Sequence, residues 1–353
     1  MGFTDELDRA QQAADDIANL TRNVAALRKE NGELRARLHL TESTLGTRLA
    51  PPKWAAPTKK RSGHVTVGLL LSDLHYEEVV RPQEINGHNA YDLSIAERRI
   101  RRAFEHGLEV ALRAAQPFKV DGGVICLNGD LLTGTIHAEL VKTNAIPVLP
   151  AALDLSALLV AGIELWATKL PNVDVYVEWG NHGRQNMKPE AKRAASENYD
   201  WLIGQLVARH FASHPTVKVH TTESYSLTFG VYNTRFLLTH GNHGIGRAAG
   251  GGIGGIWPPI MRMLAKMSQQ HVAMGDPWDV ALLGHWHQFV TKGIGSSAGQ
   301  LIINGCAIGP TEWSMQSGFT PEPPSQTVFV VSPERGVTQV LPVFVGDKKR
   351  EGW

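Results

Sequence analysis

The chain has 353 residues, with 35 Lys and Arg against 34 Asp and Glu, so its formal net charge is only +1. Its 42% hydrophobic content is enough for one large core with room for an appendage. Only two cysteines occur, Cys126 and Cys306, which excludes a disulfide framework, fits a reducing compartment and makes both packing residues. The start lacks the basic-then-apolar pattern of a signal peptide, and the nearest approach to a membrane span, 158–167, is broken by Glu164. We therefore expect a cytoplasmic protein with no membrane span.

The first 49 residues have a heptad pattern. Apolar residues recur at its a and d positions, which are Ala10, Ile17, Val24, Asn31, Leu38 and Leu45 for a, and Ala13, Leu20, Leu27 and Leu34 for d. Asn31 is a polar seam residue of the kind that fixes register in a parallel dimer. The pattern predicts an oligomerisation helix at 1–49 and a homodimer through residues 10–48. The alternative is one amphipathic helix packed on its own catalytic domain.

A Pro- and Lys-rich segment at 50–63 reads as a stiff, basic linker. Its charges either touch nucleic acid or only keep the linker soluble. The linker separates the helix from a domain at 64–346, which is followed by a C-terminal tail at 347–353.

Five short apolar runs each end in residues that can bind a metal ion. The runs read as strands at 65–71, 123–127, 173–177, 235–238 and 280–283. The segments that follow them are Asp73-Leu74-His75, Gly129-Asp130, Gly180-Asn181-His182, His240-Gly241 and Gly284-His285-Trp286-His287. Ligand sites of α/β folds gather at the carboxyl ends of strands, so we expect these segments to share one crevice.

Helices are expected between the strands, at 94–115, 150–169, 189–212 and 258–270. Ser94 and Glu97 are spaced as a capping box for the first of them. The alternation of helices and strands predicts an α/β fold. The first helix also carries an arginine cluster, which is either a phosphate-binding patch or the solvent face of a crossover helix: Arg98, Arg99, Arg101 and Arg102.

The five segments offer carboxylate, imidazole and amide ligands. Such ligands suit manganese, iron or zinc rather than calcium. Two such ions about 3.5–4 Å apart can clamp a phosphoryl group during in-line attack. A carboxylate between them would bridge both, and their shared water would become a hydroxide nucleophile near neutral pH.

The order D-x-H, G-D, G-N-H, H and G-H-x-H resembles the calcineurin-like metallophosphoesterase superfamily, from about residue 65 to 287. The resemblance implies a four-layer α/β/β/α sandwich of two mixed sheets, with strands at 301–304, 327–331 and 338–345 completing the second sheet. It also implies two divalent ions, with manganese expected and iron or zinc as alternatives. Asp73, His75 and His287 would hold one ion, Asn181, His240 and His285 the other, and Asp130 would bridge them. His182 inherits the role of a histidine that contacts the substrate or protonates the leaving group.

One position departs from the superfamily pattern. An Asp or Glu usually follows the G-N-H histidine and orients it, whereas this chain has Gly183 and then Arg184. Arg184 either grips a phosphate as a second catalytic residue or is a solvated loop arginine. Among the other histidines, His137 and His243 are within reach of a substrate by their place in the sequence, and His271 is expected at the surface.

Two further features bear on the substrate. The segment 244–255 contains seven glycines and Arg247, and is either a phosphate-approaching or lid-like loop or a plain connector. Trp257, Trp286 and Trp313 either stack on bases or pack in the fold.

These patterns predict a binuclear metal-dependent phosphoesterase. The leading substrate is nucleic acid, because the superfamily includes dimeric DNA-repair exonucleases. Against this, the chain from residue 50 onward has 28 Lys and Arg against 26 Asp and Glu, which is not the usual nucleic-acid footprint. The alternatives are a phosphodiesterase or phosphatase for nucleotides or cyclic nucleotides, then a phosphoprotein phosphatase, and, in another class, a coiled-coil assembly protein with a vestigial metal site.

Overall fold

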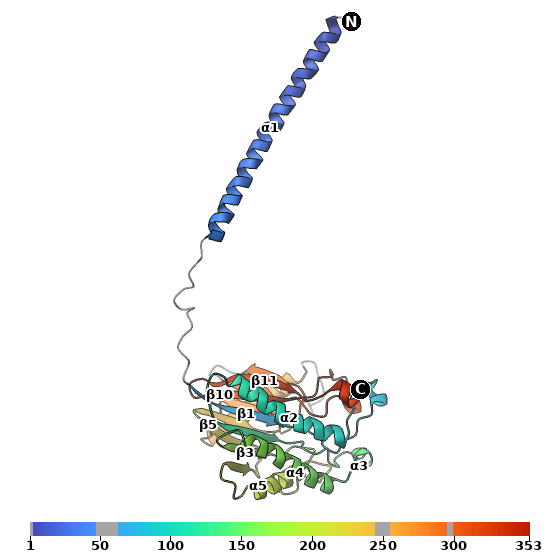
Figure 1. The fold of residues 1–353 in the computed structure, drawn as a ribbon. Helices are drawn as coiled ribbons and strands as arrows, with labels where there is room; N and C mark the ends of the chain where they lie inside the picture. The colour runs from blue at the N-terminus through green and yellow to red at the C-terminus, as the bar shows by residue number, and fades with distance from the viewer. Residues whose placement is uncertain (1–2, 47–62, 244–254, 295–298) are drawn as a thin grey trace. The chain divides into compact units, whose positions relative to one another are not determined.

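A computed structural model describes residues 3–46, 63–243, 255–294 and 299–353 (Figure 1). The chain divides into two compact units, residues 1–59 and 60–353. Most of the expected linker at 50–63 and of the glycine-rich segment at 244–255, Arg247 included, lies outside the described residues.

The first unit contains one long helix, α1 (Phe3–Gly46). The helix expected in this region is therefore confirmed. Its apolar seam is open to solvent, with Ile17 64%, Leu20 63% and Leu27 63% exposed. Self-association through that seam stays a prediction.

The second unit contains a mixed α/β fold with two mixed sheets. The first sheet has six strands in the order β11-β10-β1-β2-β3-β4. Strands β1 to β4 run parallel, whereas β10 is antiparallel to both β1 and β11. Their bounds are β1 (His64–Leu71), β2 (Lys119–Asn128), β3 (Val173–Glu178), β4 (Val217–Thr221), β10 (Ser325–Ser332) and β11 (Gly336–Phe344).

The second sheet has five strands in the order β5-β6-β7-β9-β8. Its three middle strands run parallel, and the two edge strands are antiparallel to their neighbours. The bounds are β5 (Leu227–Val231), β6 (Thr234–Leu238), β7 (Val280–Leu283), β8 (Val290–Gly293) and β9 (Gln300–Ile303). All five strands expected before the ligand segments are thus confirmed.

The placement expected for the last strands was wrong. Only β9 joins the second sheet, while β10 and β11 extend the first. The physical reason lies in β1, where Gly68 faces Phe329 of β10. A Cβ atom at Gly68 would lie 2.1 Å from Cζ of Phe329, so the bare glycine backbone admits the aromatic ring and β10 pairs at that edge.

The helices of this unit are η2 (Pro82–Ile85), α2 (Leu93–Ala114), α3 (Leu140–Thr143), α4 (Val148–Ala167), α5 (Tyr199–His210), α6 (Trp257–Ala273), α7 (Glu312–Gln316) and α8 (Lys348–Glu351). Of these, α2, α4 and α5 lie along the first sheet (Figure 1). Asp92 caps α2 by accepting the N–H of Ile95, so the expected Ser94–Glu97 capping box does not form its start. The helix expected at 189–212 begins only at Tyr199, after the N-cap Asn198.

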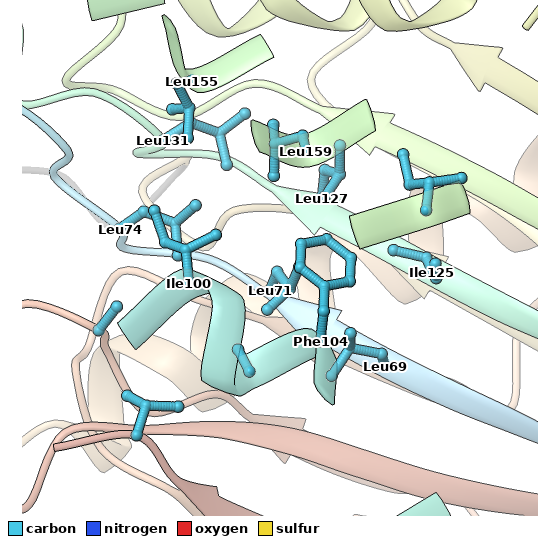
Figure 2. Close-up of a cluster of buried hydrophobic side chains, with 14 of the residues drawn as sticks. Leu69, Leu71, Leu74, Ile100, Phe104, Ile125, Leu127, Leu131, Leu155 and Leu159 are labelled. Atoms are coloured by element: carbon cyan, nitrogen blue, oxygen red, sulfur yellow. The ribbon is translucent and has the colours of Figure 1, made fainter. Parts of the chain in front are cut away.

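Three buried hydrophobic clusters hold the unit together. In the largest, Ile100 and Phe104 of α2 and Leu155 and Leu159 of α4 pack against leucine and isoleucine side chains of β1 and β2 (Figure 2). A second cluster joins residues of the two sheets: Leu70, Val124, Cys126, Phe229, Val231, Phe236, Leu238, Val280, Leu282, Ile302, Phe329 and Val331. In the third, α6 packs on the second sheet through Ile260, Met263, Leu264 and Met267.

Helix α4 differs from the sequence-based expectation about membrane spans. By length and composition it is apolar enough to cross a membrane, with a mean hydropathy of 1.8. In the structure it contacts α2, α5 and β3, and it buries Leu155, Leu159 and Trp166. Core helices pass the same test, so this finding is weak support for a membrane span.

The arginine cluster of α2 also differs from both expectations. Arg98 and Arg101 are exposed, but Arg99 is fully buried and forms an ion pair with Glu351 of α8 at 2.7 Å. The segment 347–353, expected to be a tail, therefore packs against the fold. His271, expected at the surface, is also buried, with 5% exposure, beside Asp276.

Candidate metal centre

The five ligand segments follow β1, β2, β3, β6 and β7, which are parallel strands of their sheets. Main-chain hydrogen bonds join neighbouring segments within each sheet, and the N–H of His285 joins the two sheets by donating to Oδ1 of Asp73 at 3.0 Å. Asp73 N–H donates to the carbonyl of Gly129 at 3.1 Å, and Gly284 N–H donates to that of His240 at 3.0 Å. Residues that are far apart in the sequence thus meet at one edge, as the strand pattern predicts.

Six of the seven ligand candidates form two groups. Asp73, His75 and His287 make one group, and Asp130, His240 and His285 make the other. Within each group the candidate ligand atoms lie within 4.8 Å of one another. Oδ2 of Asp130 lies 2.8 Å from Nε2 of His240, and Oδ1 of Asp73 lies 3.2 Å from Nε2 of His287.

The polar atoms of the site fit a pair of divalent ions. Both ring nitrogens of His75 and Oδ1 of Asn181 are buried without a hydrogen-bond partner among the described residues. Buried polar atoms rarely stay unpaired, because the unpaired state costs about 1–3 kcal/mol each. His240 Nδ1 is already paired with the carbonyl of Asn128 at 2.8 Å, which leaves Nε2 as its ligand atom. Imidazole, carboxylate and amide oxygen are suitable donors for such ions.

The electrostatics also favour cations at this place. Burial alone would raise the pKa of Asp130, but the neighbouring histidines outweigh it and hold that pKa well below its usual range. Burial would lower the pKa of His240, yet the charges of Asp130 and Asp73 raise it to about 10. Without ions, protons on histidine supply the positive charge that the carboxylates require. Ions that bind here displace such protons.

The backbone at the ligands is held in an unusual conformation. Asp73, His75, Asp130, His285 and His287 all have positive φ, between 47° and 67°. They make up five of the eight non-glycine residues with positive φ in the described part of the chain. Left-handed backbone is sparsely populated for such residues and persists only where the surroundings impose it. The strands and loops thus fix the ligand directions before any ion binds.

Two glycines allow the Asp130 and Asn181 loops to approach each other. Gly129 has φ +75°, and a Cβ there would lie 2.5 Å from the nitrogen of Gly180. A Cβ at Gly180 would lie 2.2 Å from Oδ1 of Asp130. The glycines of the G-D and G-N-H segments are therefore required by this close contact.

His182 lies beside both groups. Its ring is edge-on to His75, with centroids 4.7 Å apart, and its main-chain N–H donates to Oδ1 of Asp130 at 2.7 Å. Nδ1 is paired with the carbonyl of Thr133 at 2.9 Å, so Nδ1 carries a proton. That carbonyl orients the ring, which is the task that the resemblance gives to an acidic residue at position 183.

Arg184 contacts its own loop. Its guanidinium donates to the carbonyls of Asn181 at 2.9 Å, Asn186 at 2.9 Å and Met187 at 3.1 Å. Three donors therefore hold the loop that carries Asn181, a contact that neither expectation for Arg184 had included. The contact to Asn181 makes Arg184 a positioning residue in this structure.

Two buried acids, Glu77 and Asp200, and the partly buried Glu78 lie near the site, carry no motif and were missed by sequence reasoning. Glu77 accepts the N–H groups of Thr133 and Gly134, and Glu78 lies 3.9 Å from Nδ1 of His75. Burial raises the pKa of Glu78 to about 7. Asp200 accepts N–H groups from two ligand loops. The only hint in the sequence was that Gly183 stands where the superfamily pattern has an acid, so another acid could be expected to take its place.

The remaining candidates lie around the site at different distances. The ring of the exposed His137 is 5.8 Å from that of His182, and His243 packs edge-on against Trp179. Burial lowers the pKa of His243 to about 4. Trp286 is buried and Trp313 is 64% exposed. The sulfur of Cys306, expected only to pack, also accepts the N–H of Gly309 at 3.3 Å.

Comparisons with known proteins give similarities of fold only. No family model matches the sequence, and no curated protein matches it either. Among solved structures, an archaeal phosphodiesterase is 11% identical over 78% of this chain and 99% of its own, with a TM-score of 0.33. A dimetal phosphatase from Danio rerio is 13% identical over 80% and 99%, with a TM-score of 0.38. Vacuolar protein sorting 29 from Cryptosporidium parvum is 12% identical over 79% and 98%, with a TM-score of 0.31.

The chain resembles the calcineurin-like metallophosphoesterase superfamily both in the order of its motifs and in the two ligand groups that those motifs form.

Proposed function

We propose that this protein is a metal-dependent phosphoesterase that cleaves phosphodiesters with two divalent ions. The observation that carries the proposal is the pair of ligand groups, with Asp130 in one of them and in contact with His182. The groups would hold the ions through Asp73, His75 and His287 on one side and Asn181, His240 and His285 on the other, with Asp130 shared. Manganese is the ion we propose first, with iron or zinc as alternatives.

When bound, the two ions supply Lewis-acid polarisation of the phosphoryl oxygens and an activated water nucleophile. The chain supplies the rest. His182, with Nδ1 held by the Thr133 carbonyl, presents Nε2 to the reacting group. In its protonated form it donates that Nε2 proton to the departing oxygen. Arg184 holds the Asn181 loop in place through the carbonyl of that residue.

The test uses purified protein with manganese and bis-p-nitrophenyl phosphate. Wild type should hydrolyse it, and Asp130→Asn should abolish turnover while the protein stays folded. His182→Gln should lower kcat by about 10²–10⁴ for an alkyl leaving group, and less for p-nitrophenolate, which needs no proton. His137→Gln, an exposed neighbour, is the matched control and should retain activity. Full activity in Asp130→Asn would contradict the shared-carboxylate arrangement.

A cleft beside the metal centre supports a substrate larger than a phosphate. It has a volume of about 330 Å³ and runs from Trp179 and Asn181 to Asn242 and His243. Its other wall is the loop after Arg184, with Lys188, Lys192, Glu190 and Glu197. Arg184 lines the cleft as well, so three basic side chains stand against two acidic ones, which suits an anionic substrate. A phosphodiester has a second ester group to place in such a cleft, and we propose that polynucleotides are the substrates.

A small-molecule phosphodiesterase or phosphatase is the second candidate. The near-neutral charge from residue 50 onward favours it, because nucleic-acid binders are usually strongly basic. Catalytic efficiencies on single-stranded DNA, duplex DNA, RNA, cyclic nucleotides and mononucleotides separate the two. Good turnover of cyclic nucleotides with none of any polynucleotide would reverse our order.

We also propose that α1 forms a parallel homodimer that brings two catalytic units to one nucleic acid. The support is its solvent-exposed apolar seam, with Val24 45% and Leu34 57% exposed, and Asn31 at an a position. Deletion of residues 1–49, or Leu27→Asp at a d position, should give a monomer by light scattering. Lys29→Ala, outside the seam, should remain a dimer. A dimer that survives the deletion would exclude this role for α1.

The catalytic unit, as we propose it, is the four-layer α/β/β/α sandwich expected from the resemblance. The support is that buried clusters join α2 and α4 to the first sheet, one sheet to the other, and α6 to the second sheet. We do not favour an assembly protein with a vestigial site, because a dead site has no reason to keep every ligand position.

A further inference from the structure

Asp200 connects two loops of the metal centre through a single carboxylate. The residue is fully buried in the first turn of α5. Its Oδ2 accepts the N–H of Asp130 at 2.9 Å and the N–H of Gly180 at 3.0 Å. Its Oδ1 accepts the N–H groups of Leu131 at 3.2 Å and Leu132 at 3.4 Å. One side chain therefore binds the loop of the shared carboxylate and the loop of the asparagine ligand.

We propose that Asp200 is the positioning residue that sets the spacing between the Asp130 and Asn181 loops, and that Gly183 is the vacancy that admits it. The inference rests on the proposed function, because it concerns the same pair of ions. It adds a residue that touches neither substrate nor metal and acts through the main chain of two ligand loops.

Position 183 has no room for a side chain, which explains why a glycine stands there. A Cβ at this position would lie 2.3 Å from Oδ1 of Asn198 and 2.8 Å from Cγ of Asp200. No side chain fits at 183 unless these two groups move. This chain thus places its acid, Asp200, at the start of α5. The superfamily pattern instead has an acid directly after the histidine, at position 183.

The N-cap residue Asn198 links Gly180 to Asp200 by two further hydrogen bonds. Its Nδ2 donates to the carbonyl of Gly180 at 2.8 Å, and its Oδ1 accepts the N–H of Asp200 at 2.8 Å. The N–H of Tyr199 donates to the carbonyl of Gly183 at 2.7 Å. The N-terminal end of α5 is therefore hydrogen-bonded to both ends of the Gly180–Gly183 segment, and a shift of the helix would move the asparagine between them.

Only a carboxylate satisfies all four donors at position 200. Its two oxygens offer about four lone-pair sites, whereas an amide has one oxygen and turns an NH₂ group toward the other N–H donors. Asp200→Asn therefore removes two hydrogen bonds and sets donor against donor with almost no change of shape. It is a sharp test of the charge and acceptors rather than of packing.

The test compares Asp200→Asn with Glu351→Gln as a control. Glu351 is also a buried acid, but it lies in the C-terminal helix α8. In metal-free protein, amide exchange at 130–132 and 180 should be faster in Asp200→Asn by at least about tenfold. In a manganese titration the weaker of the two ions should lose about 10–100-fold in affinity. The exchange-coupled electron paramagnetic resonance signal of a manganese pair should fall. Glu351→Gln should leave these ligand-loop readouts as in wild type.

A variant with the exchange rates and manganese affinities of wild type would overturn the proposal. If Asp200→Asn fails to fold, Gly183→Ala tests the same space, since its methyl group displaces Asn198 and Asp200 but removes no hydrogen-bonding group. Two manganese ions bound to Gly183→Ala with wild-type affinity would then overturn it. If wild type binds two ions in an Asp200-dependent way but cleaves no phosphoester, the proposed function fails and the positioning role remains.

Discussion

Replacement of Arg99 by methionine should destabilise the catalytic unit far more than a surface arginine would. Its guanidinium donates to a carboxylate and to four oxygens of two loops: Glu351 Oε2, Asn89 Oδ1 and the carbonyls of Ala90, Ala307 and Ile308. Methionine keeps the apolar stem and removes every donor. The carboxylate of Glu351 and the four oxygens are then left without this partner.

The expected loss follows from burial. Breaking a buried ion pair by removing one partner costs about 3–5 kcal/mol, because the remaining charge is uncompensated. Whole domains have about 5–15 kcal/mol of stability, so the loss is a large share.

The assay is urea unfolding of the metal-free protein, followed by tryptophan fluorescence for Arg99→Met, Glu351→Gln and the double variant. The double variant should lose less than the sum of the singles, because neither charge is left unpaired. Arg101→Met is the matched control on the same helix, since Arg101 is 62% exposed and its pair with Glu97 should contribute at most about 1 kcal/mol. A loss in Arg99→Met no larger than in Arg101→Met would refute this reasoning.

Three other predictions concern pH, packing and metal removal. Burial would raise the pKa of Glu351, but the hydrogen bond and charge of Arg99 hold it below its usual range. The pair therefore stabilises the fold above about pH 4.3, the usual pKa of glutamate, and this stability is lost as pH falls through the lower folded pKa. The gap in unfolding free energy between wild type and Glu351→Gln should shrink at acid pH, and a constant gap would count against the pair. Gly68→Ala places a methyl group 2.1 Å from Cζ of Phe329 and should lower the unfolding free energy by about 1–3 kcal/mol in thermal unfolding. Gly293→Ala is the control, because no atom lies within 4 Å of a Cβ there. Equal losses in the two variants would contradict the packing account. Manganese at a hundredfold excess over its Kd should raise the unfolding free energy of wild type by about 2.7 kcal/mol, which is seen as a higher Tm. A chelator should reverse this gain. Asp130→Asn should lose most of that gain, and an equal shift in both proteins would argue against the shared ligand.

Much of the site could be predicted because its ligands are short motifs placed directly after apolar runs. Periodicity located β1, β2, β3, β6 and β7, and strand ends of an α/β fold converge. Local pattern cannot assign a strand to a sheet, which is why β10 and β11 were misplaced. Their partner was decided by the fit of Phe329 over Gly68, a contact between residues far apart in the chain.

The buried polar residues around the site escaped prediction for a different reason. Arg99 lies in a run of charged residues that resembles a surface, and Asp200 belongs to no motif. Both are buried by partners that only the fold supplies, Glu351 for Arg99 and four main-chain N–H groups for Asp200. Hydrogen-bonding partners at long range leave no periodic signal.

The left-handed backbone of five candidate metal ligands has an evolutionary consequence. A glycine at such a position would relieve strain of about 1–3 kcal/mol, at the expense of a ligand. Drift toward stability alone would therefore erode this site faster than an ordinary surface cluster. If the five residues bind the ions as we propose, selection for the reaction is what would keep Asp73, His75, Asp130, His285 and His287 at these positions, because stability alone would favour glycine there.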